Sequence, residues 1–195
     1  LLESGASSEA AAIGNMIEEP LLDWGAAELG YKIAKNVSIV HPEGILAANL
    51  DAKALAPVDN EGLEAKTSGI VSGRAFEEWG DQGTDQVPDR VTVQCQEQML
   101  VANMKVVWVP ALIAGMGRRL YKVERDDELI AIIKQRAYEF WMNHVVPRIP
   151  PENCRPSLEV VKRLMREPSK TINLPANYWS DLKEAKDAVK QAEGK

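Results

Sequence analysis

The chain has 195 residues, of which 45% are hydrophobic and 27% charged, as is typical of one globular domain with an extension. No stretch approaches the roughly 18 consecutive apolar residues of a membrane span, so we expect a cytoplasmic protein that does not contact membranes. The formal net charge of −6 excludes a protein that coats nucleic acid over its whole surface, because phosphate binding needs clustered Lys and Arg. A local site stays open, since carboxylates that hold a divalent cation add negative charge themselves.

Cysteine and histidine are scarce. Cys95 and Cys154 are too few for a disulfide framework or an all-cysteine zinc site, and we expect reduced thiols. The two histidines, His41 and His144, lie far apart in the sequence, which argues against a histidine-rich zinc site. The sequence also lacks a Gly-rich phosphate loop and a dinucleotide-binding fingerprint, which argues against an ATP-driven motor.

The first half of the chain predicts one helix and three strands. Ser7 to Leu29 is Ala-rich with apolar residues at helical spacing, and its Gly and Pro residues predict a kinked or two-part helix. Tyr31 to His41 and Ile45 to Asp51 form a predicted hairpin around the Pro42–Gly44 turn. Leu63 to Thr67 alternates like a third strand.

The second half continues with a loop, a helix, a strand and a helix. Ile70 to Asp89 is Gly-rich and polar and predicts a loop. Val91 to Ala102 predicts a helix that carries Gln94, with Val91, Cys95, Gln98, Met99 and Ala102 on one side. Val106 to Ala114 is an apolar run of the length of a buried strand, and Asp126 is the expected N-cap of the clearest helix.

The fold class follows from this order of elements, which predicts an α/β core with a central mixed sheet flanked by helices. Prolines from Pro147 onward mark a linker, and charged helices are predicted over 158–165 and 181–192. We therefore expect a core over residues 1–147 and a C-terminal helical extension over 148–195. The chain does not begin with Met, so we expect that its N-terminal segment is missing.

Three polar residues on the predicted strands suggest a metal site. Asp51 ends one strand, and Glu64 and Lys66 are two apart on the next, where side chains on the same face recur. The oxygens of Asp51, Glu64 and the Ala65 carbonyl suit a hard cation such as Mg²⁺. Lys66 would then lie beside the water that attacks a phosphoryl group.

This spacing is weak evidence by itself, because an acid followed by Glu-x-Lys occurs by chance in many soluble proteins. In the alternative interpretation, Glu64 and Lys66 form a solvated strand face and Asp51 is a turn residue. The surrounding motifs decide between the two.

Taken together, the motifs resemble those of the lambda exonuclease and YqaJ-type viral recombinase nucleases. In that family a helix with Gly-x-x-x-Glu precedes a hairpin ending in Asp, then Glu-x-Lys, an aromatic loop and a helix with Gln-x-Gln. The matching residues are Gly14 to Glu18, Asp51, Glu64-Ala65-Lys66, Trp79 with Pro88, Gln94-Cys95-Gln96, Arg125-Asp126 and Phe140-Trp141. The resemblance covers roughly Ile13 to Val146.

The resemblance implies a role for each matching residue. Asp51 and Glu64 would be metal ligands and Glu18 would complete the metal site, with Glu19 as its substitute if the register is off by one. Glu64 and Lys66 would be catalytic, and Gln94 would support the site. Two departures stand out: Ala52 follows Asp51 where the family commonly has Gly, and the family's phosphate-binding N-terminal Arg has no counterpart here.

The same resemblance implies a restriction-endonuclease-like fold and an activity. The expected function is a Mg²⁺-dependent (or Mn²⁺-dependent) exonuclease that resects double-stranded DNA ends for single-strand-annealing recombination. A ring-like homotrimer, a single-strand annealing partner and, for a phage-encoded protein, the host cytoplasm are implied as well. Two alternatives stay open: another nuclease of the superfamily, such as an endonuclease or repair nuclease, and a non-catalytic DNA-binding or assembly module.

Further DNA contacts are expected around the site. Phe76 and Trp79 on the polar loop could stack on a base or wedge a duplex end, or equally could pin the loop onto the core. Arg118 and Arg119, with Lys122, could contact phosphates, or could belong to a solvated turn.

Overall fold

The structure, a computed structural model, describes residues 9–69, 78–151, 173, 175 and 177–193. The chain divides into two compact units, Leu1–Pro150 and Pro151–Lys195, and each is described by itself. Within the described ranges, no helix has both the length and the apolar character that crossing a membrane requires.

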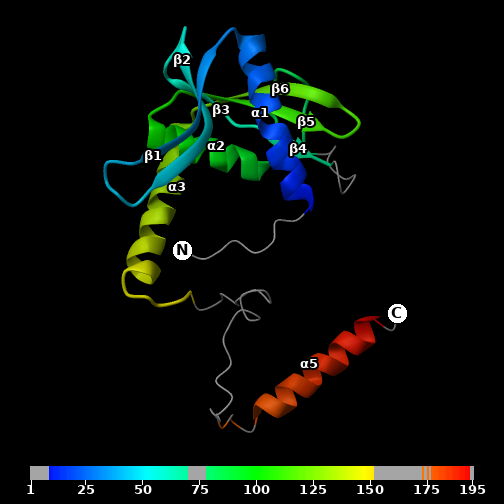
Figure 1. The fold of residues 1–195 in the computed structure, drawn as a ribbon. Helices are drawn as coiled ribbons and strands as arrows, with labels where there is room; N and C mark the ends of the chain where they lie inside the picture. Colours follow the sequence, from blue (N-terminus) through cyan, green and yellow to red (C-terminus); the bar gives the residue numbers. More distant parts are fainter. Residues whose placement is uncertain (1–8, 70–77, 152–172, 174, 176, 194–195) are drawn as a thin grey trace. The chain divides into compact units, whose positions relative to one another are not determined.

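A six-stranded mixed sheet forms the first unit's centre (Figure 1). Its strand order is β1-β2-β3-β5-β4, and β6 pairs with β5. β3 and β4 run parallel to β5, whereas all other pairs are antiparallel, so the predicted mixed sheet is confirmed. The strands are β1 Lys32–Val40, β2 Ala47–Ala56, β3 Glu61–Leu63, β4 Lys66–Ser68, β5 Val106–Ile113 and β6 Gly117–Glu124.

Helices cover both faces of this sheet. Alternate residues of β5 separate the faces: Val107 and Val109 join the core under α2, whereas Trp108 packs in the cluster under α1. The helices of the first unit are α1 Glu9–Leu29, α2 Asp89–Ala102, α3 Asp127–Phe140 and the short π-helix η1 Trp141–Val145.

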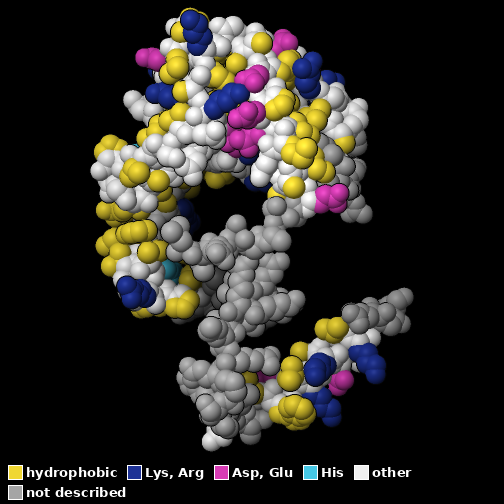
Figure 2. Space-filling view, viewed as in Figure 1, with side chains coloured by type: hydrophobic (Ala, Val, Ile, Leu, Met, Phe, Trp, Pro, Cys, Tyr) yellow, Lys and Arg dark blue, Asp and Glu magenta, His cyan; other side chains and the backbone are white. Residues whose placement is uncertain are grey.

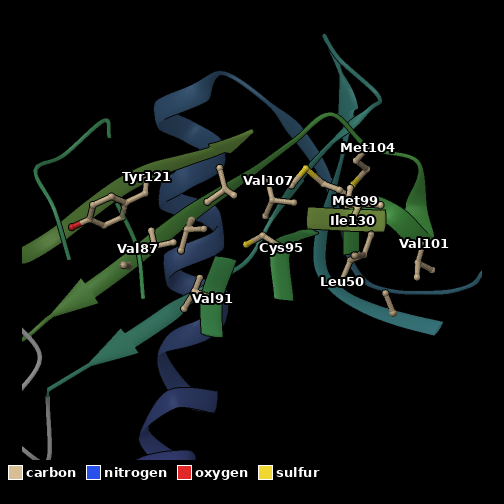
Figure 3. Packing of buried hydrophobic residues seen from close by; sticks show 14 of the residues in the cluster. Leu50, Val87, Val91, Cys95, Met99, Val101, Met104, Val107, Tyr121 and Ile130 are labelled. Atoms are coloured by element: carbon tan, nitrogen blue, oxygen red, sulfur yellow. The ribbon is translucent and has the colours of Figure 1, made fainter. Parts of the chain in front are cut away.

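The larger core lies between α2 and the sheet (Figure 3). Val91, Cys95 and Met99 recur at helical spacing on α2, and none is more than 1% exposed. They pack with the alternate inward residues of β5, as the sequence pattern predicts. Cys95 is thus a buried free thiol.

The smaller core lies under α1, which is one continuous helix with Pro20 inside it. Leu22 and Ala26 pack there with Ala52 and Leu63. Gly25 lets the helix approach closely, because a Cβ at this position would lie 3.0 Å from Pro110 Cβ. A helix is confirmed over the described residues as one element and not in two parts, and its predicted start at residue 7 lies outside them.

Two strand predictions were wrong in detail. β2 extends to Ala56, so Asp51 lies inside the strand and not at its end. The expected strand over 63–67 is divided into β3 and β4, with Glu64 and Ala65 between them. The Glu64 N–H still donates to Trp108 O, at 2.9 Å, so this break stays attached to β5.

β6 was missed by the sequence pattern, which left Arg118 and Arg119 open between phosphate contacts and a solvated turn. Tyr121 and Val123 are buried on one face in the second half of the strand, whereas none of its first four residues is buried. Four charged side chains in eight residues hid this alternation.

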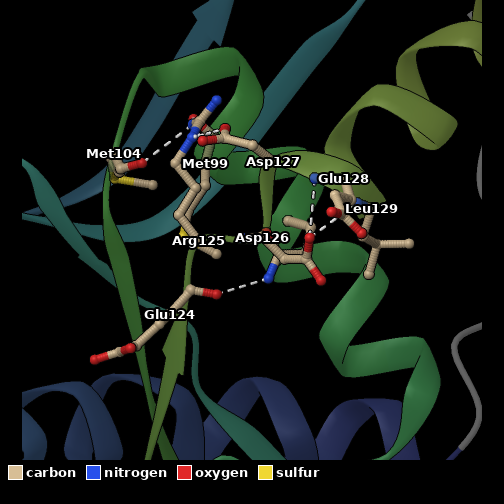
Figure 4. Close-up of polar contacts among 9 residues, drawn as sticks. Met99, Met104, Glu124, Arg125, Asp126, Asp127, Glu128 and Leu129 are labelled. Carbon is tan, nitrogen blue, oxygen red and sulfur yellow. Dashed lines mark hydrogen bonds and ion pairs between the residues drawn. The ribbon is translucent and has the colours of Figure 1, made fainter.

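The start of α3 is fixed by side chains (Figure 4). The Asp126 carboxylate accepts from the Glu128 and Leu129 N–H groups at 3.0 Å each, so the predicted N-cap is confirmed. Arg125 donates to the carbonyls of Met99 and Met104, which ties the end of β6 to α2.

Apolar side chains gather on the surface of α3 and η1 (Figure 2). Among them are Phe140, which is 53% exposed, and Met142, which is 50% exposed.

In the second unit, the structure describes α5, Asn177–Glu193, whose side chains over residues 177–191 are exposed. The helix predicted over 181–192 is therefore confirmed, whereas the one over 158–165 lies outside the described residues.

Candidate active site

The candidate site lies where β3 ends and β4 begins. Glu64 and Ala65 occupy this break, and Lys66 opens β4 at the edge of the sheet. α2 approaches from one side with Gln94, and α1 from the other with Glu18. The polar residues at the break between β3 and β4 therefore lie between α1 and α2.

Glu64 is the most enclosed polar group there, with 2% of its surface exposed. Its Oε1 accepts from Lys66 Nζ at 2.5 Å and from Gln94 Nε2 at 2.6 Å. Its Oε2 accepts from Gln98 Nε2 at 2.6 Å. Lys66 Nζ also donates to Gln94 Oε1 at 2.9 Å. Four side chains thus form one connected network, as a buried carboxylate requires.

Asp51 faces this network from β2. Its Oδ2 accepts the Ala65 N–H at 2.9 Å, so the strand break contacts Asp51 through its backbone. Burial, and after it the negative charges of Glu64 and Glu18, raise the pKa of Asp51 to about 7. The Ala65 hydrogen bond and the Lys66 charge oppose that shift.

Glu18 approaches this group from α1, on the side opposite to α2. It lines a cavity of about 230 Å³ between α1 and the start of β4, and its charge acts on Asp51. The other lining residues are Ala11, Gly14, Asn15, Leu21, Ala65, Lys66 and Thr67. Glu18, Ala65 and Lys66 therefore line one cavity, whereas Asp51 and Glu64 are not among its lining residues. The role of Glu18 as the acid that completes a metal site stays a prediction.

The donor chemistry of the site fits a hard divalent cation. Asp51 and Glu64 repel each other in a partly dry environment, and a cation relieves such repulsion. Within the described residues, however, no group of three acidic, His or Cys side chains is gathered closely enough to enclose a metal. Two carboxylates therefore form the centre of the candidate site, and Glu18 stands at longer range.

Gln98 is a site residue that the motif-based prediction missed. The motif pointed to Gln94 and Gln96, but an α-helix turns these two residues to different sides. Gln96 faces away and bonds Glu124 O at 2.8 Å and the Asp126 N–H at 2.9 Å. Gln98 lies one helical turn after Gln94, and both side chains donate hydrogen bonds to the Glu64 carboxylate. The four-residue spacing was the available signal.

Trp79 does not face the solvent, so the predicted DNA contact is wrong and the alternative, a residue that pins the loop, holds. It is 5% exposed, and its ring centroid lies 5.1 Å from that of Tyr121. The Tyr121 hydroxyl donates to Gly80 O and fixes the same segment. Phe76 lies outside the described residues.

The predicted basic residues separate onto the two faces of β6. The Arg118 guanidinium lies 4.8 Å from the Trp24 ring centroid, on the α1 side. Lys122 forms an ion pair with Glu124 at 2.6 Å. Arg119 pairs in register with Ala111, which pairs in turn with Lys66. Arg119 therefore shares a sheet row with the site, and Arg118 does not.

The mixed sheet with helices on both faces is the α/β architecture that the sequence predicted. Residues 1–105 match the model of the YqaJ-like viral recombinase domain. The chain belongs to that family, so the resemblance found in the sequence motifs is confirmed.

Three known proteins illustrate the relationship. The uncharacterized protein YqaJ of Bacillus subtilis (strain 168) is 30% identical over 147 residues, which cover 73% of this chain and 44% of that protein. The chain thus spans less than half the length of this relative. An alkaline exonuclease from Laribacter hongkongensis superposes with a TM-score of 0.55 at 19% identity, covering 82% of this chain and 76% of the other. A phage-related exonuclease from Haemophilus somnus 129PT also scores 0.55, at 14% identity, covering 75% and 76%.

Proposed function

We propose that the chain is a Mg²⁺-dependent deoxyribonuclease, and specifically an exonuclease that resects double-stranded DNA from an end. The observation that carries the proposal is the buried Glu64–Lys66 pair, set beside Asp51 at the break between β3 and β4. Membership of a viral recombinase family and the fold shared with two exonucleases support it.

In this proposal each residue has a separate task. Asp51 and Glu64, with the Ala65 carbonyl and Glu18, would hold the cation, which when bound polarises the phosphoryl oxygen. Lys66 reaches the Glu64 carboxylate from the cavity side, so its ammonium can orient the attacking water and attract the phosphate. Gln94 forms hydrogen bonds with both Lys66 and Glu64, and so fixes the distance between the Lys66 ammonium and the Glu64 carboxylate.

The decisive experiment is digestion of end-labelled duplex DNA with Mg²⁺ or Mn²⁺ by the unsubstituted chain and three variants. Asp51→Ala and Glu64→Ala should abolish cleavage because each removes a metal ligand. Lys66→Ala should lower turnover about 10²- to 10⁴-fold while the cation still binds. Activity retained by Asp51→Ala or Glu64→Ala would contradict the proposed site.

Two further measurements address the competing functions. Cleavage of covalently closed circular DNA would indicate an endonuclease, because a circle offers no end. Absence of Mn²⁺ binding in calorimetry would indicate a non-catalytic DNA-binding or assembly module on the same fold.

The wider context is part of the same proposal. A ring-like homo-oligomer would keep the enzyme on one duplex, and a single-strand annealing protein would take up the exposed strand. Both tasks belong in the cytoplasm, or in the host cytoplasm if a phage encodes the chain. Size-exclusion chromatography with light scattering measures the oligomeric state directly.

A further inference from the structure

Gln98 is nearly as enclosed as the carboxylate that it contacts. It is 2% exposed, and its Nε2 donates to Glu64 Oε2 at 2.6 Å. The same nitrogen lies 3.4 Å from Asn49 O, on β2. Gln98 thus joins α2 to the break that carries Glu64 and to β2, which carries Asp51.

The two oxygens of Glu64 have different surroundings. Oε1 accepts from Lys66 and Gln94, on the side where Lys66 lines the cavity, whereas Oε2 accepts from Gln98. A carboxylate can rotate about its last bond unless a partner holds each oxygen. The Gln98 amide supplies that partner for Oε2.

A neutral donor suits this position better than a charged one. An ammonium or guanidinium at Oε2 would neutralise Glu64 from behind and weaken its attraction for a cation. An amide satisfies the buried oxygen and leaves the carboxylate's negative charge in place.

We infer that Gln98 is a positioning residue, which holds Oε2 of Glu64 so that Oε1 faces Lys66 and the cation. The inference rests on the proposed function, because it assigns Glu64 to a metal site. It adds a residue outside the recognised motif and gives the two Glu64 oxygens separate tasks.

Gln96 offers a matched control on the same helix. It is also 2% exposed and also hydrogen-bonded, but to Glu124 and Asp126 and not to Glu64. Gln98→Met and Gln96→Met each remove a buried amide and keep the length of the side chain. Any general loss from an unpaired buried group therefore affects both variants.

The experiment titrates Mn²⁺ alone into the full chain by calorimetry, with thermal unfolding of each variant in parallel. Gln98→Met should bind Mn²⁺ about 10- to 100-fold more weakly, the usual effect of losing a partner of a metal ligand. Gln96→Met should lose thermal stability but keep the Mn²⁺ affinity. If Gln98→Met does not unfold cooperatively, Gln98→Asn, whose amide is one methylene too short, replaces it with the same expectation.

Wild-type affinity in Gln98→Met, or an equal loss in Gln96→Met, would overturn the inference while leaving the proposed function intact. No Mn²⁺ binding by the unsubstituted chain would overturn the proposed function itself, and the inference with it.

Discussion

At the scale of single residues, the most unusual group is Asp51, whose folded-state pKa of about 7 lies well above its ordinary value of 3.8. Between these values the folded chain binds a proton that the unfolded chain releases. Stability of the cation-free protein should therefore fall as pH rises from about 4 to about 7, and level off above.

Asp51→Asn should remove this pH dependence. The amide oxygen can still accept the Ala65 N–H, while the buried charge is gone. We expect the cation-free variant to be more stable than the parent at pH 8 by about 1–2 kcal/mol, the partial exposure of Asp51 reducing the full effect. Urea unfolding at pH 4, 6 and 8 measures this difference.

The control is Asp85→Asn, which removes one negative charge from an exposed loop position. Its stability should follow the parent's at every pH. Equal slopes for Asp51→Asn and the parent would show that Asp51 ionises normally in the fold.

Arg119 and Arg118 form a natural pair for testing DNA contact. Arg119 and Lys66 are both in register with Ala111 on β5, so at the usual spacing between strands they lie about 10 Å apart. The Arg118 guanidinium instead lies over the Trp24 ring. Arg119→Gln should weaken duplex binding and lower the slope of log affinity against log salt by about 1. Fluorescence anisotropy in Ca²⁺ measures both quantities.

Arg118→Gln should leave that slope unchanged, since its guanidinium lies over the Trp24 ring and Arg118 is not in the sheet row of Lys66. A slope reduced only in Arg118→Gln would place the DNA on the opposite face of the sheet.

The sequence carried most of the site because its chemistry is local to a few short motifs. Glu64, Lys66 and Gln94 share one hydrogen-bonded network, Asp51 accepts the N–H of Ala65 beside it, and Glu18 lines a cavity with Lys66. Trp79 was ambiguous because an aromatic in a polar loop has the same pattern whether it faces solvent or core. Only the long-range contact with Tyr121 decides, and that contact is not encoded locally.

At the scale of elements, α1 contains two glycines with opposite steric surroundings. A Cβ at Gly14 would meet Thr67 Oγ1 at an ordinary 3.6 Å, whereas a Cβ at Gly25 would press on Pro110 at 3.0 Å. Gly14→Ala should stabilise the fold by about 0.5–1 kcal/mol through helix propensity. Gly25→Ala should lose that gain to overpacking, which typically costs about 1–3 kcal/mol.

Thermal unfolding of the two variants beside the parent compares these effects in one helix. Stabilisation by both substitutions would mean that α1 moves away from β5 at little cost.

Helices and strands whose apolar residues recur at regular spacing were predictable from the sequence. Those in which charged residues interrupt that spacing were not. α2 and β5 carry uninterrupted apolar patterns, and both formed where the pattern indicated. β6 mixes charged residues into its alternation, and the break at Glu64 depends on a hydrogen bond to β5 far along the chain. Pairing with distant strands determines the secondary structure of such segments, so local periodicity could not predict it.

At the scale of the whole molecule, the division near Pro150 predicts an autonomous first unit. Both cores and all the candidate site residues lie before that point. A chain ending at residue 150 should therefore unfold cooperatively at nearly the same temperature as the full chain, and should keep the same Mn²⁺ affinity. Circular dichroism and calorimetry measure the two properties. Loss of cooperative unfolding on truncation would assign residues 151–195 a structural role.

The crowding of Asp51, Glu64 and Glu18 also sets the order of events at the site. Asp51 and Glu64, with Glu18 at longer range, repel a phosphodiester while they attract a cation, so DNA should enter only after the cation has reversed the local field. Thermodynamic reciprocity then requires that DNA tighten cation binding by the same factor. In this way the cation would control the affinity for DNA, and a chain with a net charge of −6 would bind DNA weakly until magnesium is present.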